Sequence, residues 1–207
     1  MNLKSKKSYR VAKYLLLNRV TSQTKLSQDT GVAIGYVNEV LQYLADLDIV
    51  KINYGKTSLQ DYAKLLDKIS MDRSFKKIII ETIRLPTSTI RDTENMLNSF
   101  CYHTHMQYAF TGFSGLRHYY EYHISYPLVH LYVQTTKEKF SIERGEGVIP
   151  VVLLKTDRPD IISNSKLMNN VSVCEKIQVI IDLYSSGIGR DAAIKSYRDL
   201  IWKKEPY

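Results

Sequence analysis

Residues 25–44 contain two short runs with helical spacing that meet at Gly31. A glycine is favoured where one helix must stop and the chain must turn sharply, because it tolerates positive φ. Val32 follows and is expected to fill the inside of the turn. This spacing is typical of a helix-turn-helix, whose second helix can enter the major groove of DNA.

The second run, from Ile34 onward, has one apolar and one polar face. At about 100° per residue, its apolar side chains form a stripe that we expect to be buried. The stripe consists of Ile34, Val37, Val40, Leu41 and Leu44. The opposite face carries short or polar side chains, which can reach base edges and leave room for close approach to DNA. It comprises Gly35, Asn38, Glu39 and Gln42, flanked by Tyr36 and Tyr43.

Residues 48–57 follow at once and predict a short β-hairpin, or wing. Ile49, Val50, Ile52 and Tyr54 form a β-prone run that is broken by Gly55. Lys51 and Lys56 stand where a wing meets phosphate. With a helix predicted upstream at residues 8–19, the order becomes helix, helix, helix, wing. The segment therefore predicts a winged helix, and the expected DNA-binding residues are Lys25, Gly35, Tyr36, Asn38, Glu39, Gln42, Tyr43, Lys51, Asn53 and Lys56.

Two residues fit this interpretation less well. Ala33 occupies the position where Ser, Thr or Asp would cap the second helix. Glu39 places a carboxylate on the face toward DNA, where it would either accept a hydrogen bond from a cytosine amino group or remain solvated. A short helix, a glycine turn and an amphipathic helix also occur in α-domains that bind no nucleic acid. The hairpin is the feature that favours DNA binding.

The charge is distributed unevenly. The chain of 207 residues has a net charge of +8 and an isoelectric point near 9.3. Residues 1–60 hold nine Lys/Arg against four Asp/Glu, and residues 61–207 hold twenty against seventeen. The N-terminal segment thus has the excess of positive charge expected of a phosphate-binding module. Lys4, Lys6 and Lys7 form either a flexible basic arm or a solvated, disordered terminus.

Hydrophobic periodicity changes from helical to strand-like across residues 70–74, after a helix predicted at residues 60–69 that packs back on the winged helix. We therefore predict a linker there and two domains, residues 1–72 and 73–207. The second domain is expected to contain strands at residues 75–83, 128–133 and 148–154, with helices at 88–100, 174–185 and 190–203. The predicted fold class is α+β, an N-terminal winged helix-turn-helix followed by a mixed α+β domain.

Cysteine content and hydropathy limit where the protein works. Cys101 and Cys174 are far apart and have no ligand-like spacing, which argues against a disulfide framework and a zinc ribbon. No apolar run approaches the length of a membrane span, and the N-terminus lacks the apolar core of a signal peptide. We expect a cytoplasmic protein with no membrane partner.

The polar and aromatic clusters of the second domain are better explained by structural roles than by metal, phosphate or base binding. Five histidines lie within 28 residues, with His103 and His105 expected on one side of a strand. A metal site is conceivable there, but no carboxylate or second cysteine follows at ligand spacing. The sequence Thr111-Gly112 before Ser114-Gly115 lacks the phosphate-loop pattern and favours a tight strand-to-helix turn. The tyrosines could stack on unpaired bases, although half-buried packing is favoured; they are Tyr108, Tyr119, Tyr120, Tyr122 and Tyr126.

No residue pattern indicates catalysis. A nucleotidyltransferase would need paired carboxylates for magnesium, yet Glu121 is the single acid near Ser114-Gly115. Asp157 and Asp160 flank Pro159 in a predicted loop, and Asp182 stands between apolar residues of a predicted helix. We expect no enzymatic activity, no cofactor and no metal.

Three segments of the second domain carry a resemblance to a known family: residues 107–116, residues 129–133, and residues 177–184 followed by 189–193. Their order and spacing resemble the C-terminal domain of AbiEi-type antitoxins and related winged-helix regulators. That family has a Tyr-Ala-Thr-Gly segment, a Tyr-Val strand and a Gln-x-x-x-Asp-Leu helix that leads into a Gly-Arg turn. The resemblance implies a DNA-binding, often autoregulatory repressor that counters a nucleotidyltransferase-like toxin in type IV toxin–antitoxin systems.

The sequence thus predicts a transcriptional regulator that binds double-stranded operator DNA, such as its own promoter. Repression as the antitoxin of a toxin–antitoxin operon is the leading interpretation. A winged-helix regulator that senses a small ligand is the first alternative, and a nucleic-acid-modifying enzyme targeted by its winged helix is the second. The oligomeric state and the existence of a toxin partner stay open at this stage.

Overall fold

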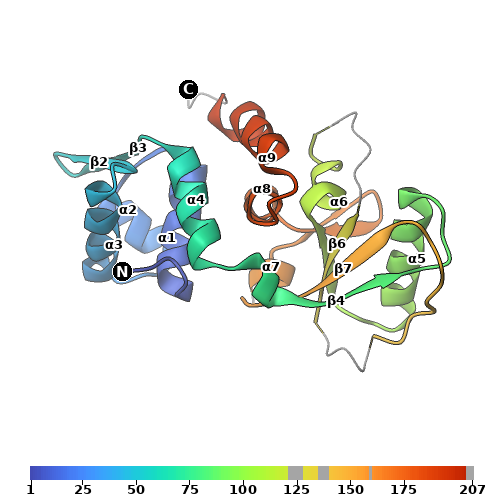
Figure 1. Ribbon diagram of the computed structural model, residues 1–207. Helices are drawn as coiled ribbons and strands as arrows, with labels where there is room; N and C mark the ends of the chain where they lie inside the picture. The colour runs from blue at the N-terminus through green and yellow to red at the C-terminus, as the bar shows by residue number, and fades with distance from the viewer. Residues whose placement is uncertain (121–127, 135–139, 159, 204–207) are drawn as a thin grey trace. The chain divides into compact units, whose positions relative to one another are not determined.

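The computed structural model describes residues 1–120, 128–134, 140–158 and 160–203 (Figure 1). The fold is mixed α+β, with N-terminal helices followed by a six-stranded sheet. The chain divides into two compact units, Met1–Ser74 with Ile194–Tyr207 and Phe75–Ala193. The predicted boundary near residue 72 lies close to this division. The predicted second domain, however, ran to residue 207, whereas the end of the chain belongs to the first unit.

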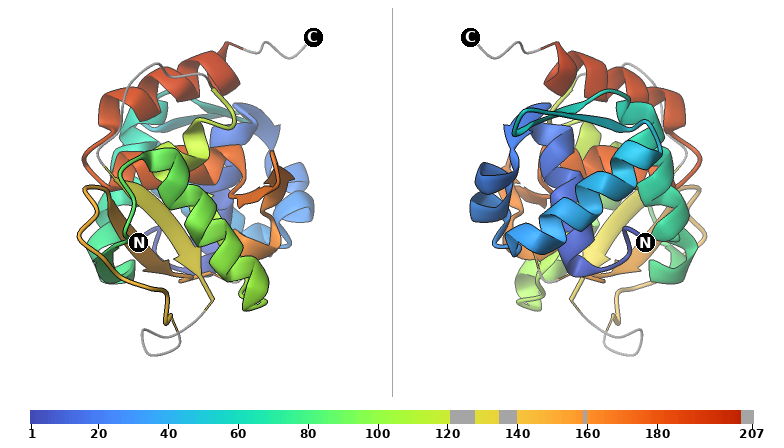
Figure 2. Two further views of the ribbon diagram at one scale, coloured as in Figure 1. Left: turned by 90° about the vertical axis from the view of Figure 1, so that its right-hand side faces the viewer. Right: turned by 90° about the vertical axis from the view of Figure 1, so that its left-hand side faces the viewer.

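Residues 1–74 form four helices and a small antiparallel sheet of strand order β1-β3-β2. The elements are α1 (Lys6–Leu17), β1 (Val20–Ser22), α2 (Gln23–Thr30), α3 (Ile34–Asp46), β2 (Val50–Asn53), β3 (Lys56–Leu59) and α4 (Tyr62–Asp72). The right-hand view of Figure 2 shows α1, α2 and α3 in shades of blue. The helices predicted at 8–19 and 60–69 correspond to α1 and α4.

Helices α2 and α3 meet at Gly31, whose φ of 64° lies in the left-handed region that glycine tolerates. Helix α3 then begins after Ala33, which provides no side-chain cap, as the sequence predicted. The buried face of α3 consists of Val37, Val40, Leu41 and Leu44. Ile34 was predicted in the same stripe but is 50% exposed, because it is the first residue of the helix and lies beyond the core.

Strands β2 and β3 form the predicted hairpin. They pair from Val50 and Leu59 at the base to Asn53 and Lys56 at the tip. The connecting residues Tyr54 and Gly55 both have positive φ, 42° and 78°. A two-residue turn with positive φ at both positions matches the right-handed twist of the strands, which explains the glycine. Strand β1, which the sequence analysis missed, adds to the outer edge of β3.

The chain returns to the first unit at its C-terminal end. Helix α9 (Arg190–Tyr197) leads into a π-helical turn at Arg198–Trp202. Tyr197 is fully buried, donates from its hydroxyl to the carbonyl of Leu16 at 2.6 Å, and stacks on Tyr62 with ring centres 4.5 Å apart. This packing places the end of the chain in the first unit, whereas the predicted second domain ran to residue 207.

Trp202 fixes the final turn. The guanidinium carbon of Arg19 lies 3.6 Å from the centre of a Trp202 ring, and Arg19 Nη1 donates to the Trp202 carbonyl at 2.9 Å. A guanidinium over an indole face combines dispersion with attraction to the ring quadrupole. Tyr197 and Trp202 therefore lie 181 and 183 positions along the chain from Leu16 and Arg19, the residues that they contact.

The second unit is a six-stranded mixed sheet of order β4-β7-β6-β5-β9-β8. Figures 1 and 2 show α5 on one face and α6 with α8 on the other. The elements are β4 (Ile79–Arg84), α5 (Ile90–His103), β5 (Tyr108–Thr111), α6 (Gly112–Leu116), β6 (Val129–Val133), β7 (Pro150–Lys155), α7 (Asp160–Ser163), β8 (Lys166–Met168), β9 (Val171–Val173) and α8 (Lys176–Ser185). Strand β6 is central and buried along its whole length.

The sequence located part of this sheet. The strands predicted at 128–133 and 148–154 are β6 and β7, and the helices predicted at 88–100 and 174–185 are α5 and α8. The strand predicted at 75–83 was wrong at its start, where Phe75–Ile78 form a 3-10 turn before β4. The predicted linker at 70–74 was also wrong, because α4 continues to Asp72 and Arg73 is 3% exposed.

Candidate nucleic-acid interface

Helix α3 presents its polar face to solvent. Gly35, Asn38, Glu39 and Gln42 are exposed, while the apolar face packs inside the first unit. A Cβ added at Gly35 would meet no atom within 4 Å, so the surface beside it is open. The face that the sequence predicted for DNA contact is therefore accessible over about two turns of the helix.

The start of α2 lies beside the middle of α3. Gln23, the first residue of α2, donates from Nε2 to Oδ1 of Asn38 at 3.2 Å. Ser22 caps α2 by accepting a hydrogen bond from the amide of Lys25 at 3.1 Å. The Lys25 side chain is exposed in the same turn. The sequence analysis missed Gln23, although a polar residue directly after a Ser N-cap was the signal that could have drawn attention to it.

The hairpin places its predicted contacts on one face. Lys51 pairs with Ser58 and Asn53 with Lys56, so these side chains share a face, and Lys51, Asn53 and Lys56 are exposed. Lys56 also pairs with Ser22 of β1. Gln23 follows Ser22 directly and contacts Asn38. The hairpin is therefore linked to α3 through Ser22 and Gln23 at the start of α2.

The two tyrosines that flank α3 are half-buried and serve its packing. The hydroxyl of Tyr36 lies 3.0 Å from Ser5 Oγ, and Lys7 Nζ lies 6.0 Å from its ring centre. At the other end, Lys68 of α4 lies 5.6 Å from the Tyr43 ring centre. A hydrogen bond with Tyr43 is the main reason why the pKa of Lys68 is raised. These contacts attach α3 to α1 and α4.

The basic N-terminus is ordered, which corrects both predictions for Lys4, Lys6 and Lys7. Leu3 is fully buried, and its amide donates to Asp72 Oδ2 at 2.7 Å. Lys6 and Lys7 form the first turn of α1. An apolar anchor at Leu3 thus converts the expected free arm into a fixed basic corner next to Tyr36.

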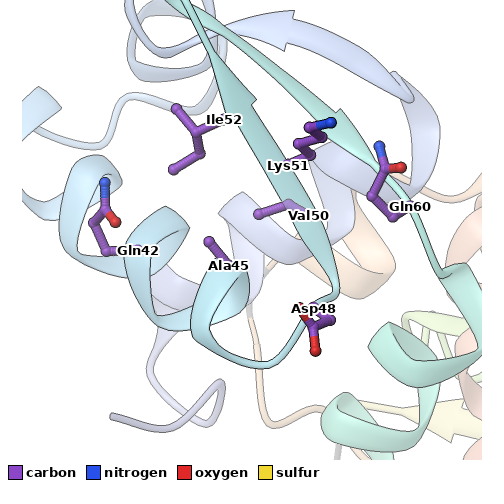
Figure 3. Close-up of a pocket in the computed structure, with 7 residues that line it drawn as sticks. All are labelled: Gln42, Ala45, Asp48, Val50, Lys51, Ile52 and Gln60. Atoms are coloured by element: carbon purple, nitrogen blue, oxygen red, sulfur yellow. The ribbon is translucent and has the colours of Figure 1, made fainter.

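An open depression of about 680 Å³ lies between α3 and β2 (Figure 3). Its apolar part consists of Ala45, Val50 and Ile52. Gln42 contributes a polar group from the helix, whereas Figure 3 shows the Lys51 side chain on the other side of β2 from Val50 and Ile52. Asp48 and Gln60 complete the lining. The depression separates the two groups of predicted contacts, those of the helix and those of the hairpin.

The net charges of the two units differ more than the net charges of residues 1–60 and residues 61–207. The first unit contains sixteen Lys/Arg against nine Asp/Glu, and the second contains thirteen against twelve. Part of the excess comes from the C-terminal segment, where Lys195, Arg198 and Lys203 are exposed. Nearly all of the net positive charge therefore belongs to the unit that contains α3 and the hairpin.

The four described histidines of the second unit do not gather into a metal centre. His103 ends α5 and His105 lies in the following turn with φ of 51°, so the prediction that both face one side of a strand was wrong. Burial lowers the pKa of His118 and of His130 to about 4. Within the described part of the chain, no three His, Cys, Asp or Glu side chains gather as metal ligands. His123 lies outside it.

Asp182 is committed to an internal hydrogen-bond cluster. Its carboxylate is fully buried and accepts from Thr111 Oγ1 at 2.8 Å, Gln178 Nε2 at 2.9 Å and Tyr132 Oη at 3.1 Å. At the adjoining strand-to-helix turn, Gly112 has φ of 59°, and a Cβ there would lie 2.6 Å from His130 Nδ1. The tight turn between β5 and α6 was predicted, and this close approach explains its glycine.

The remaining candidates for chemistry have structural partners. Asp157 forms an ion pair with Arg158, and Asp160 begins α7. Burial raises the pKa of the Cys101 thiol to about 12, which keeps it protonated at neutral pH. Tyr119 donates to the Cys174 carbonyl at 2.8 Å, and Tyr108 and Tyr120 are half-buried. The other residues considered lie outside the described residues: Glu121, Tyr122, Tyr126 and Pro159.

Comparisons with protein-family models, with curated proteins and with solved structures gave no match. Across the described residues, every helix is too short or too polar to cross a lipid bilayer.

Proposed function

We propose that this protein is a sequence-specific transcriptional regulator that binds double-stranded DNA through a winged helix in its first unit. The element order α1, β1, α2, α3, β2, β3 supports this assignment. The observation that carries it is the exposed polar face of α3 beside a hairpin whose lysines share one face. An α-helix fits the major groove of DNA, and base edges there present distinct donors and acceptors.

In this proposal α3 reads the bases. Asn38 and Gln42 offer amide donors and acceptors one helical turn apart, and Glu39 would accept from a cytosine amino group. Lys25, Lys51 and Lys56 supply cations to the adjacent phosphates, and Asn53 adds a neutral hydrogen bond. The positive charge of the first unit adds affinity for any sequence.

The test is to retain genomic DNA fragments on the purified full-length protein and to sequence them. A defined site is expected, and a site in its own promoter would support autoregulation. Replacing Asn38 or Gln42 with Ala should weaken binding to that site by about 1 to 3 kcal/mol and leave binding to random DNA almost unchanged. Equal losses of affinity for both kinds of DNA would show that these two residues do not recognise bases.

The hairpin contacts have a separate signature. Lys51→Ala or Lys56→Ala should weaken binding to all sequences alike and reduce the slope of log K against log salt by about 1. Lys64→Ala, which removes an exposed lysine from α4, is the matched control and should leave the slope unchanged. An unchanged slope in the two hairpin variants would mean that Lys51 and Lys56 do not contact phosphate and that the wing does not lie on DNA.

Repression and the antitoxin role depend on the family resemblance of the second unit. The internal use of Asp182 favours a binding role for this unit over a catalytic one. The full-length chain should rescue cells from a nucleotidyltransferase-like toxin encoded beside it. Failure to rescue, combined with intact operator binding, would leave a regulator without an antitoxin role.

A further inference from the structure

We propose that Gln23 is a positioning residue that fixes the Asn38 amide so that Asn38 reads adenine. This inference rests on the proposed DNA-binding function. Gln23 Nε2 donates to Asn38 Oδ1 at 3.2 Å, from the first residue of α2 to the middle of α3. The Asn38 side chain has no other hydrogen-bond partner among the described residues. Its remaining polar groups are therefore available to an external partner.

The start of α2 is held firmly enough to orient a neighbouring side chain. Ser22 caps the helix through the amide of Lys25, and Ser22 also pairs with Lys56 in the sheet. Gln23 follows directly on this anchored residue. By contrast, the terminal torsion of an unrestrained asparagine is broad and roughly two-fold, so its amide can present either end to a partner.

The hydrogen bond leaves Asn38 with a defined set of groups. An amide oxygen has two acceptor positions and an amide nitrogen has two N–H donors. Gln23 occupies one acceptor position, so one acceptor and the donors remain side by side. Adenine offers the complementary pair in the major groove, an N6 amino donor next to the N7 acceptor. Gln23 thus prevents the amide from turning over and selects this arrangement.

The experiment selects binding sites from a random DNA pool with the full-length protein and its variants. Asn38→Ala identifies the base position that Asn38 reads, and we expect adenine there in the unaltered protein. Gln23→Ala should reduce the preference for adenine at that position alone, by about 2- to 10-fold, the contribution of one hydrogen bond. In the Asn38→Ala background, Gln23→Ala should cause no further change at that position.

A second variant tests the orientation of the amide. A carboxylate at position 23 accepts but cannot donate, so Gln23→Glu should make Asn38 turn its amino group toward the carboxylate. The outward oxygen would then prefer a base that donates, such as cytosine through its N4 amino group. The control is Gln28→Ala, which removes an exposed glutamine from the same helix and should leave every preference unchanged.

The outcomes separate the inference from the proposed function. Equal loss at all positions in Gln23→Ala would make Gln23 a phosphate contact, and no loss at all would make its hydrogen bond irrelevant. Either result overturns the inference while the DNA-binding function stands. A pool without any enriched sequence overturns the proposed function and the inference together. Thermal unfolding of each variant verifies that the half-exposed position 23 tolerates the change.

Discussion

Helix α3 of the first unit exposes Asn38, Glu39 and Gln42, whereas helix α8 of the second unit buries Gln178 and Asp182 completely. The residue types are similar, but α8 is covered on all sides and its polar groups are satisfied within the protein. Those of α3 are exposed. Burial thus decides whether a polar side chain stabilises its own unit or remains available to a partner.

The comparison predicts that buried side chains govern stability, and Tyr197 should have the largest effect. Tyr197→Ala is expected to lower the free energy of unfolding by about 3 to 5 kcal/mol, because it leaves a cavity in the first unit. Tyr197→Phe, which keeps the ring and loses the hydrogen bond to Leu16, should lose about 1 kcal/mol. Trp202, the single tryptophan, provides a fluorescence signal for denaturant unfolding of this unit. An unchanged unfolding midpoint in Tyr197→Ala would show that the end of the chain does not contribute to the core of the first unit.

Removing a buried carboxylate should have the next largest effect. Asp182→Ala leaves buried donors on Thr111, Tyr132 and Gln178 without this acceptor, and we expect a loss of roughly 3 kcal/mol. The matched variant Asn38→Ala removes an exposed polar group and should change stability by less than about 0.5 kcal/mol. Denaturant unfolding followed by circular dichroism measures both. Similar losses of unfolding free energy in the two variants would show that burial does not distinguish the polar residues of α3 from those of α8.

Acid should affect the two units differently, because all five histidines lie in the second. Burial lowers the pKa of His130 to about 4, below its ordinary value of 6.5. The unfolded chain therefore binds more protons between these values, so stability is complete above pH 6.5 and falls as the pH approaches 4. The total loss from His130 is roughly 3 kcal/mol. His118, whose pKa is also lowered to about 4, adds to the effect.

His130→Phe tests this assignment. The variant should unfold with a weaker dependence on pH between 4.5 and 7, since it removes one of the two histidines whose pKa is lowered. The Trp202 signal of the first unit should stay almost constant over the same range. If the variant retained the full pH dependence, groups other than His130 would have to titrate.

The smallest expected effect concerns the start of α3. Ala33 precedes the helix with an extended backbone but provides no side-chain hydrogen bond. Ala33→Ser should supply this cap and raise stability by about 1 kcal/mol. DNA binding should not change, because the substitution lies outside the proposed reading face. A gain in stability accompanied by lost binding would place Ala33 in the interface.

Local sequence patterns were sufficient to locate most elements of the first unit, with β1 as the exception. The glycine at position 31, the apolar period of α3 and the Tyr54-Gly55 turn each depend on neighbouring residues, so the pattern located them. Apart from Ile34, the same period separated the exposed polar side chains of α3 from its buried apolar ones. In the second unit, strands as short as β8 and β9 escaped detection, because three residues carry too little periodicity to distinguish them from a loop.

Contacts between residues that are far apart in the sequence became apparent from the fold alone. Tyr197 and Trp202 pack against Leu16 and Arg19 of the first unit. Gln23 of α2 donates a hydrogen bond to Asn38 of α3. No local pattern encodes such contacts, because they depend on how whole elements pack. The same holds for Asp182, whose partners come from β5, β6 and α8. The sequence specifies which groups each side chain carries. Packing of the elements determines whether those groups are buried and bonded within the protein or exposed to a partner.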